Sequence, residues 1–343
     1  MGSTFLPVSL FPRQRRRISS ASHPIVLVYL HHVATYLPTA VVSNDHFTRR
    51  NGLSSEWIVE RTGIRERRRA AAGENTNTMA ILAAQRVLEQ AAGIDTAEID
   101  LIIGATYTPH DTIVTLAHAV QHALGVADIP VVSISSACSS LLNAVEIVQG
   151  YFAMGKARRA LVITSEHNTA YNNEDDTVAG HLWGDGAAAL LFTPERLTPT
   201  DLRVVDVITG GAATMGKATT AVTLQPLNRS IIMPHGRDVF QYACQYMARV
   251  TEQILTRHQL TVQDVTWLIP HQANGRISDN VMRATGLPPE RLVSNVEVLG
   301  NTGCAGAAIG LADTLPKLEP GNRVVVTVFG GGYSYGAMLL VRE

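Results

Sequence analysis

The sequence has little net charge, few cysteines and no long apolar run. A formal net charge of −1 over 343 residues argues against a general attraction to nucleic acid or anionic lipid. The three cysteines form no C-x-x-C pair, which rules out a disulfide framework and is typical of a reducing cytoplasm. No apolar run is long enough to span a membrane. These absences predict a cytoplasmic protein that binds no nucleic acid and does not span a membrane.

The chain has enough apolar residues to build a large core. Its composition is 46% hydrophobic, and its length alone suggests about two domains. Strand-like runs alternate with helical patterns and glycine-rich turns. This alternation predicts an α/β fold in which helices cover the faces of sheets.

The second half of the chain repeats the first. Cys138 lies 23 residues before Leu161. Leu161 belongs to an apolar strand, and an apolar helix separates the two residues. Asn301 lies 23 residues before Val324 in the same arrangement, and both halves end on a glycine-led apolar strand. Such self-similarity indicates a tandem duplication. Cys138 and Asn301 then occupy equivalent places, at two helix N-termini that meet near a pseudo-twofold axis.

The folded pattern begins near residue 25. We predict a flexible extension over residues 1–24 and two halves over 25–198 and 199–343. The extension contains a basic cluster, so a targeting arm is an alternative, although Pro7 and Pro12 argue against a regular amphipathic helix there.

Cys138 stands at the junction of a β-type run and an apolar helical stretch. A thiol at a helix N-terminus faces unpaired N–H groups and the positive end of the helix dipole, both of which favour thiolate. The small residues Ala137, Ser139 and Ser140 would leave room for a substrate. The position therefore suggests a nucleophile, the alternative being a buried core cysteine.

Two polar side chains in the second half are candidate partners for Cys138. His271 follows an apolar strand and shares its turn with Gln272, Asn274 and Arg276. Asn301 lies in a glycine-rich approach to a helix, where a ligand can come close to the backbone. Asn301 also suits a helix N-cap, and the two roles are compatible.

The sequence resembles the β-ketoacyl-acyl carrier protein synthase III family of the thiolase superfamily over residues 25–343. The family implies a thiolase-like α/β fold whose two duplicated halves form a five-layered α-β-α-β-α sandwich, and it implies a homodimer. Four motifs carry the resemblance: Ser136-Ala-Cys138, Pro270-His-Gln-Ala-Asn274, Gly300-Asn-Thr302 and Phe329-Gly-Gly-Gly332.

The resemblance implies a Cys138, His271 and Asn301 triad that condenses an acyl-CoA starter with malonyl-acyl carrier protein, with loss of carbon dioxide. Cys138 would hold the starter as a thioester, with its own N–H and that of Gly331 as the oxyanion hole. Neutral His271 and Asn301 would donate hydrogen bonds to the malonyl thioester carbonyl. No metal and no redox cofactor is needed.

The same resemblance implies where coenzyme A and the carrier protein bind. Trp57 and Arg61 would contact the nucleotide end of the acyl-CoA. Arg276 would line the same entrance and meet the phosphopantetheine or the carrier protein. Asn274 and Phe329 belong to the matching motifs and are also expected to bind coenzyme A or the substrate.

Several segments depart from the family pattern. Gly303, Cys304 and Gly306 change the usual Gly-Asn-Thr-Ser-Ala-Ala-Ser motif beside Asn301. An acidic stretch at 172–179 stands where many members carry an arginine over the adenine of coenzyme A. The basic run at 65–69 is expected to be solvated unless it docks something acidic.

Polar residues near the expected acyl pocket suggest an unusual starter. The candidates for this pocket are His110, Ile113, His235, Arg237 and Cys304. We expect the segment of His110 and Ile113 to reach the acyl pocket of a partner subunit. His110, His235 or Arg237 could pair with a carboxylated acyl chain, the alternative being placement on the surface.

Three other functions compete with condensation. A related acyltransferase or ketosynthase of specialised metabolism would use Cys138 to transfer an unusual acyl group. A Cys/His hydrolase uses a similar pair, but no protease-type cysteine motif is present. A non-catalytic relative is disfavoured because Cys138, His271 and Asn301 are all intact.

Overall fold

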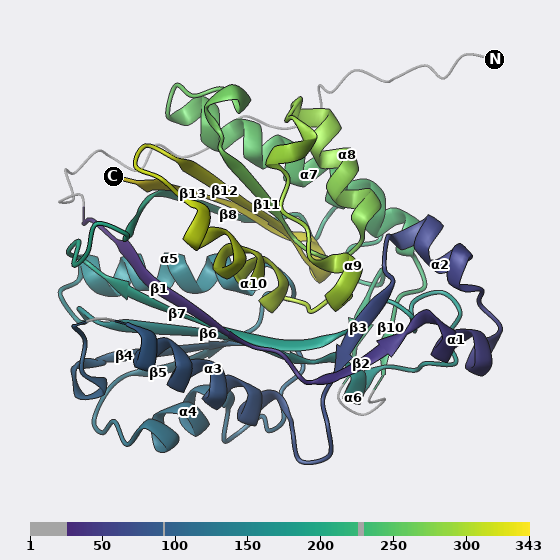
Figure 1. The fold of residues 1–343 in the computed structure, drawn as a ribbon, viewed down its shortest axis with the longest axis horizontal. Helices are drawn as coiled ribbons and strands as arrows, with labels where there is room; N and C mark the ends of the chain where they lie inside the picture. Colours follow the sequence, from purple (N-terminus) through teal and green to yellow (C-terminus); the bar gives the residue numbers. More distant parts are fainter. Residues whose placement is uncertain (1–25, 92, 226–229) are drawn as a thin grey trace.

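The computed structural model describes residues 26–91, 93–225 and 230–343 (Figure 1). The predicted N-terminal extension, residues 1–24, lies outside these described residues. Within them, every helix is too short or too polar to cross a membrane.

Five strands of the first half form one part of the sheet. Their order is β5 (Val131–Ile134), β4 (Leu101–Ala105), β6 (Ala160–His167), β7 (Asp185–Thr193) and β1 (Tyr29–Tyr36). β4 is parallel to both β5 and β6, whereas β7 is antiparallel to β6 and β1. Every residue of β7 is buried, as expected for a central strand with helices on both faces.

The second half repeats this order. Its strands are β11 (Trp267–Pro270), β12 (Arg323–Phe329), β13 (Ser334–Arg342) and β8 (Leu202–Gly211), and an isolated bridge at Leu292 takes the place of β5. The strand directions match those of the first half. A two-residue pairing of β1 with β8 joins both parts into a nine-stranded sheet.

The helices form three layers around the two parts of the sheet (Figure 1). The central layer contains one helix from each half, and both contact strands of both halves because small residues allow a close approach. This arrangement confirms the predicted five-layered α-β-α-β-α sandwich. The layers are α3 (Thr76–Gln90) with α4 (Leu116–Leu124), then α5 (Ser140–Ala153) with α10 (Ala305–Thr314), and α7 (Gly236–Arg257) with α8 (Gly275–Thr285).

Short elements gather at one end of the sandwich (Figure 1). Some of these elements pack around a small core of Phe47, Ile58, Ile64 and Val296. The elements are β2 (Ala40–Ser43), α1 (Asn44–Asn51), α2 (Ser55–Thr62), β3 (Glu66–Arg69), α6 (Asn168–Tyr171), β9 (Thr223–Leu224), β10 (Ile231–Ile232) and α9 (Val296–Leu299).

Candidate active site

One cavity collects the predicted triad. Cys138, His271 and Asn301 all line a cavity of about 320 Å³. Cys138 precedes α5, His271 follows β11 and Asn301 precedes α10, so the two halves contribute to the same site. The duplication thus brings Cys138 together with two residues that lie more than 130 positions later in the chain.

A tight turn positions Cys138 ahead of α5. Ala137 has a left-handed φ of 50°, which is uncommon for a residue other than glycine. The Ser139 hydroxyl donates to the carbonyl of Ser136 at 2.8 Å, and that of Ser140 donates to the carbonyl of Ala137 at 2.6 Å. Ser139 and Ser140 are buried and do not line the cavity. Of the three small residues predicted to leave room for a substrate, Ala137 lines the cavity, whereas Ser139 and Ser140 hold the turn instead.

Both amides of the predicted oxyanion hole lie at the sulfur of Cys138. The N–H groups of Cys138 and Gly331 hydrogen-bond to it and lower its pKa. The neighbouring Gly330 allows this approach, since a Cβ there would lie 2.8 Å from the Cys138 nitrogen.

The pKa of Cys138 differs from the sequence expectation. Burial, and then the carboxylate of Glu166, raise it to about 12, and these effects exceed those of the nearby donors. The helix end alone therefore does not produce a thiolate near neutral pH in the resting protein.

His271 is held at the end of β11 and is 4% exposed. The backbone N–H of His271 donates to the carbonyl of Thr327 on β12 at 2.7 Å. Burial lowers the pKa of the imidazole to about 4, so His271 is neutral near pH 7. This is the form that can donate a hydrogen bond to a substrate oxygen without protonating a carbanion.

Asn301 is fixed by its backbone and its side-chain oxygen. Its N–H donates to Leu182 O at 2.8 Å, and its carbonyl accepts from Gly184 N at 3.0 Å. Asn301 Oδ1 accepts from the N–H of Gly303 at 3.0 Å. With Oδ1 engaged, the amide nitrogen is the group that remains to donate into the cavity.

Two polar residues at the site were missed by the sequence reasoning. Tyr107 follows β4 and lines the cavity, and Glu166 lies near the end of β6 and is fully buried. Both occupy the carboxyl ends of parallel strands, next to the end of β5 that leads to Cys138, and this placement was the available signal. Burial raises the pKa of Glu166 to about 7.

The predicted coenzyme A residues lie beside the cavity. Asn274 and Phe329 line it, whereas Trp57, Arg61 and Arg276 do not. Asn274 caps α8 through the N–H of Arg276 at 2.9 Å and donates to the carbonyl of Arg61 at 3.3 Å. The guanidinium of Arg61 lies 4.9 Å from the Trp57 ring centroid. α2 and α8 therefore bring Trp57, Arg61, Asn274 and Arg276 together, whereas Phe329 lies at the end of β12.

None of the predicted acyl-pocket residues lines the cavity. His110, Ile113, His235 and Arg237 are exposed, although Gly236 is part of the wall. Cys304 is buried, and its Sγ lies 3.0 Å from Glu166 Oε1. The wall is instead mostly apolar, including Val222, Leu224, Ile231, Met233, Val239 and Phe240.

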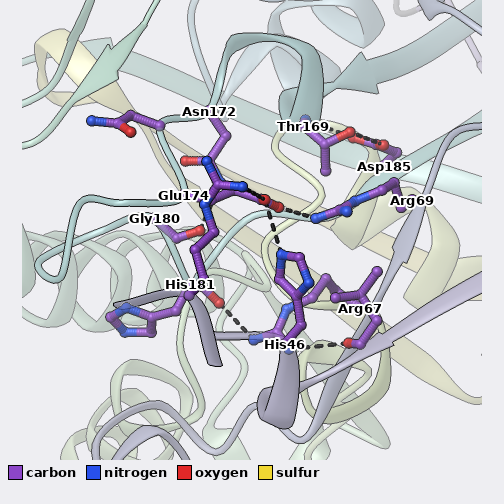
Figure 2. A network of polar contacts seen from close by, with 12 residues as sticks. His46, Arg67, Arg69, Thr169, Asn172, Glu174, Gly180, His181 and Asp185 are labelled. Atoms are coloured by element: carbon purple, nitrogen blue, oxygen red, sulfur yellow. Dashed lines mark hydrogen bonds and ion pairs between the residues drawn. The ribbon is translucent and has the colours of Figure 1, made fainter. Parts of the chain in front are cut away.

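Arg69, at the end of the basic run, binds the acidic stretch (Figure 2). Arg69 pairs with Glu174, which also accepts from His46 Nε2 at 2.9 Å. Arg50 pairs with Asp175 at 2.8 Å. The acidic loop is therefore docked onto α1 and β3, which resolves the alternative left open for the basic run.

Arg67 ties this docked loop to the site. Its guanidinium is buried and donates to Val42 O at 3.1 Å, Asn44 Oδ1 at 2.9 Å and His181 O at 2.6 Å. His181 precedes Leu182, the residue that holds the N–H of Asn301. Burial lowers the pKa of Arg67 to about 10, which leaves the guanidinium charged at neutral pH.

We expect Arg67→Met to lower the free energy of unfolding by about 2–4 kcal/mol, since it leaves two buried acceptors and one partly buried acceptor without a donor. Urea unfolding followed by circular dichroism measures the loss. Arg68→Met is the matched control, because the neighbouring Arg68 is less buried and makes one long hydrogen bond, to Pro38 O at 3.4 Å. Equal losses in the two variants would contradict a special role for Arg67.

Comparison with known proteins agrees with this geometry. The family models 3-oxoacyl-[acyl-carrier-protein] synthase III and its C-terminal counterpart match residues 132–211 and 255–342. A beta-ketoacyl-[acyl-carrier-protein] synthase III of Rhizorhabdus wittichii is 36% identical over 308 residues, covering 88% of this chain and 95% of the relative.

Solved structures extend the agreement to three dimensions. The 3-oxoacyl-[acyl-carrier-protein] synthase III of Aquifex aeolicus superposes with a TM-score of 0.85 at 30% identity, covering 92% of this chain and 99% of that one. The priming beta-ketosynthase of the R1128 polyketide pathway superposes with a TM-score of 0.82 at 29% identity, covering 92% and 96%. Fold, site geometry and sequence together show that the chain belongs to the 3-oxoacyl-[acyl-carrier-protein] synthase III family.

Proposed function

We propose that the protein condenses an acyl-CoA starter with malonyl-acyl carrier protein, with loss of carbon dioxide, through an acyl thioester on Cys138. As a member of its family it is an acyl-transferring condensing enzyme. The observation that carries the finer proposal is the single cavity lined by Cys138, His271 and Asn301. A nucleophile and two separate hydrogen-bond donors are what a two-stage condensation requires.

In the first stage, Cys138 takes the starter acyl group. Its sulfur attacks the thioester carbonyl, and the N–H groups of Cys138 and Gly331 stabilise the oxyanion that forms. The bond to the coenzyme A sulfur then breaks. Coenzyme A leaves as the thiol, with the proton that Cys138 gives up.

In the second stage, His271 and Asn301 act on the malonyl thioester. Both donate to its carbonyl oxygen, so the electron pair left by departing carbon dioxide is held as an enolate. The carbanion attacks the acyl carbon, the bond to the Cys138 sulfur breaks, and the 3-oxoacyl product forms. The released thiolate takes a proton from solvent. No step calls for a metal or a redox cofactor.

The entrance would bind the two thioester carriers. Trp57 and Arg61 are offered for the nucleotide end of coenzyme A, and Arg276 for the phosphopantetheine or the acyl carrier protein. Asn274 and Phe329 would line the path from this entrance to Cys138. The packing of α2 against α8 supports a shared entrance, because the amide of Asn274 joins the two helices.

The starter is better matched by a plain acyl chain than by a carboxylated one. The apolar wall supports this reading, and the exposure of His235 and Arg237 removes the main argument for a carboxylated chain. Burying an unpaired carboxylate against such a wall would be costly.

We also propose that the protein forms a homodimer and is located in the cytoplasm. β5 is an edge strand, and the nearby Ile113 and Val114 are 84% and 56% exposed. An unpaired edge beside exposed apolar residues is suited to pairing with a second copy. His110 and Ile113 would then reach the partner's acyl pocket. The free state of all three cysteines suits a reducing compartment.

A second candidate is acyl transfer or ketosynthesis in specialised metabolism. It is favoured by the similarity to a priming ketosynthase of a polyketide pathway. Such an enzyme would acylate Cys138 in the same way but deliver the acyl group to a different acceptor.

Intact-protein mass spectrometry after exposure to a panel of acyl-CoAs tests the proposal. We expect a single acyl adduct, which malonyl-acyl carrier protein clears while a 3-oxoacyl product forms. An adduct that malonyl-acyl carrier protein leaves in place, but another nucleophile removes, would overturn condensation in favour of the second candidate.

A further inference from the structure

Tyr107 places a hydroxyl group beside the sulfur of Cys138. Both residues line the same cavity, and the Tyr107 hydroxyl is close enough to the Cys138 sulfur to lower the pKa of Cys138. Tyr107 comes from the end of β4 and Cys138 from the end of β5, two adjacent parallel strands. The contact therefore follows from the pairing of the strands.

Asn168 sets the direction of the hydroxyl hydrogen bond. Its Nδ2 donates to the carbonyls of Gly184 at 2.8 Å and Asn301 at 3.1 Å, which leaves Oδ1 to face Tyr107. The Tyr107 hydroxyl donates to this Oδ1 at 2.7 Å. Hydrogen bonds thus run from the backbone carbonyl of Asn301 through Asn168 to the Tyr107 hydroxyl, which lies beside the Cys138 sulfur. Tyr107 has one proton and two possible acceptors.

The position of the ring depends on a glycine. A Cβ at Gly303 would lie 2.7 Å from both Cε1 and Oη of Tyr107. Gly303 also has a left-handed φ of 58°, which favours glycine. The departure from the family motif at Gly303 is therefore explained, because the missing side chain makes room for Tyr107.

We propose that Tyr107 is a further catalytic residue, whose hydroxyl turns from Asn168 to the Cys138 sulfur when the thiolate forms and stabilises it for acyl transfer. An anionic sulfur is a stronger acceptor than a neutral amide oxygen, so the proton moves by rotation about the C–O bond. Tyr107 keeps this proton throughout the reaction. This inference rests on the proposed function, in which Cys138 is the nucleophile.

The alkylation of Cys138 by iodoacetamide tests the inference without an acyl substrate. The Cys138 peptide is followed by mass spectrometry in the full-length protein between pH 8 and pH 10. Tyr107→Phe is expected to slow alkylation roughly tenfold to hundredfold, the loss typical of one hydrogen bond to a charged group. The pH profile should shift upward by about one to two units, because the thiolate loses a donor.

The pH range avoids other groups that face the sulfur. Glu166 has a pKa of about 7 and is largely ionised throughout the range, while His271, with a pKa of about 4, stays neutral. The pKa of Cys304 is raised well above its ordinary value, so this thiol stays protonated. None of the three should distort the comparison of variants.

Tyr171→Phe is the matched control. Its hydroxyl donates to the carbonyl of Pro109, in the same segment as Tyr107, but Tyr171 does not line the cavity. An equal loss in Tyr171→Phe would assign the effect to loosening of the segment and overturn the inference. A Tyr107→Phe rate within twofold of wild type would also overturn it.

A second variant covers the case in which Tyr107→Phe does not fold. Site-specific replacement of Tyr107 by 3-fluorotyrosine keeps the shape but makes the hydroxyl a better donor. Alkylation at or above the wild-type rate supports the inference, and slower alkylation contradicts it. If the alkylation effects are seen but the wild-type protein does not condense acyl-CoA with malonyl-acyl carrier protein, the contact between Tyr107 and Cys138 stands and the proposed function is refuted.

Discussion

Cys138→Ala is expected to abolish the acyl adduct and to lower condensation by roughly 10⁴-fold or more, the scale seen when a covalent nucleophile is removed. No other thiol can replace it. Within the described residues, Cys138 is the one cysteine that lines the cavity, whereas Cys244 and Cys304 lie outside it. Intact-protein mass spectrometry and product formation from malonyl-acyl carrier protein measure the two losses.

Cys244→Ala provides the control for Cys138→Ala. Cys244 lies on α7 and is only partly buried, so its loss should change neither the adduct nor the rate. An adduct of undiminished mass and amount on Cys138→Ala would show that another group carries the acyl chain.

His271→Ala is expected to separate the two stages of the reaction. The variant should still form the acyl adduct on Cys138, because His271 is assigned to the malonyl thioester. Condensation should fall by about 10²- to 10⁴-fold, the range for losing a positioned donor or acid–base group. Acylation is measured by mass spectrometry, and condensation by release of carbon dioxide from malonyl-acyl carrier protein.

His122→Ala is the matched control for His271→Ala, since His122 is exposed on α4 in an outer layer. It should leave both stages unchanged. Loss of acylation together with condensation in His271→Ala would contradict the division of labour and would assign His271 to activating Cys138.

The pKa of His271 gives this second prediction a pH dependence. Its folded value of about 4 lies below the ordinary 6.5, so the folded protein favours the neutral imidazole. The unfolded chain binds more protons between these values, and this contribution to stability is lost as pH falls from 6.5 toward 4. The ratio of the wild-type condensation rate to that of His271→Ala should stay constant above about pH 6 and decline toward pH 4.

The elements of the fold were predictable because their patterns are local. The apolar runs around Cys138 and Asn301 became β5, α5 and α10, and the 23-residue offsets became equivalent positions in two copies of one sheet order. The repeat also predicted that two helix N-termini would meet. The triad in one cavity follows from that symmetry, together with the motifs that carry the family resemblance.

Burial and long-range pairing were decided only in three dimensions. Whether Cys138 is a thiolate depends on the balance between nearby donors and desolvation, and desolvation is a property of everything packed around the sulfur. The roles of Ser139 and Ser140 depend on which way their hydroxyls face. His235 and Arg237 were predicted to bind a polar acyl group, but both are exposed to solvent in the folded protein.

The sequence by itself determined the layered α/β fold and its duplication, because periodicity is read along the chain, and its family resemblance implied the chemical class of the site. Tertiary structure alone decided that Arg69 binds the acidic loop, that Gly303 makes room for Tyr107, and that Asn168 links Tyr107 to Asn301. These contacts join residues far apart in sequence whose types are individually common. No local pattern specifies them, since each depends on the packing of several elements at once.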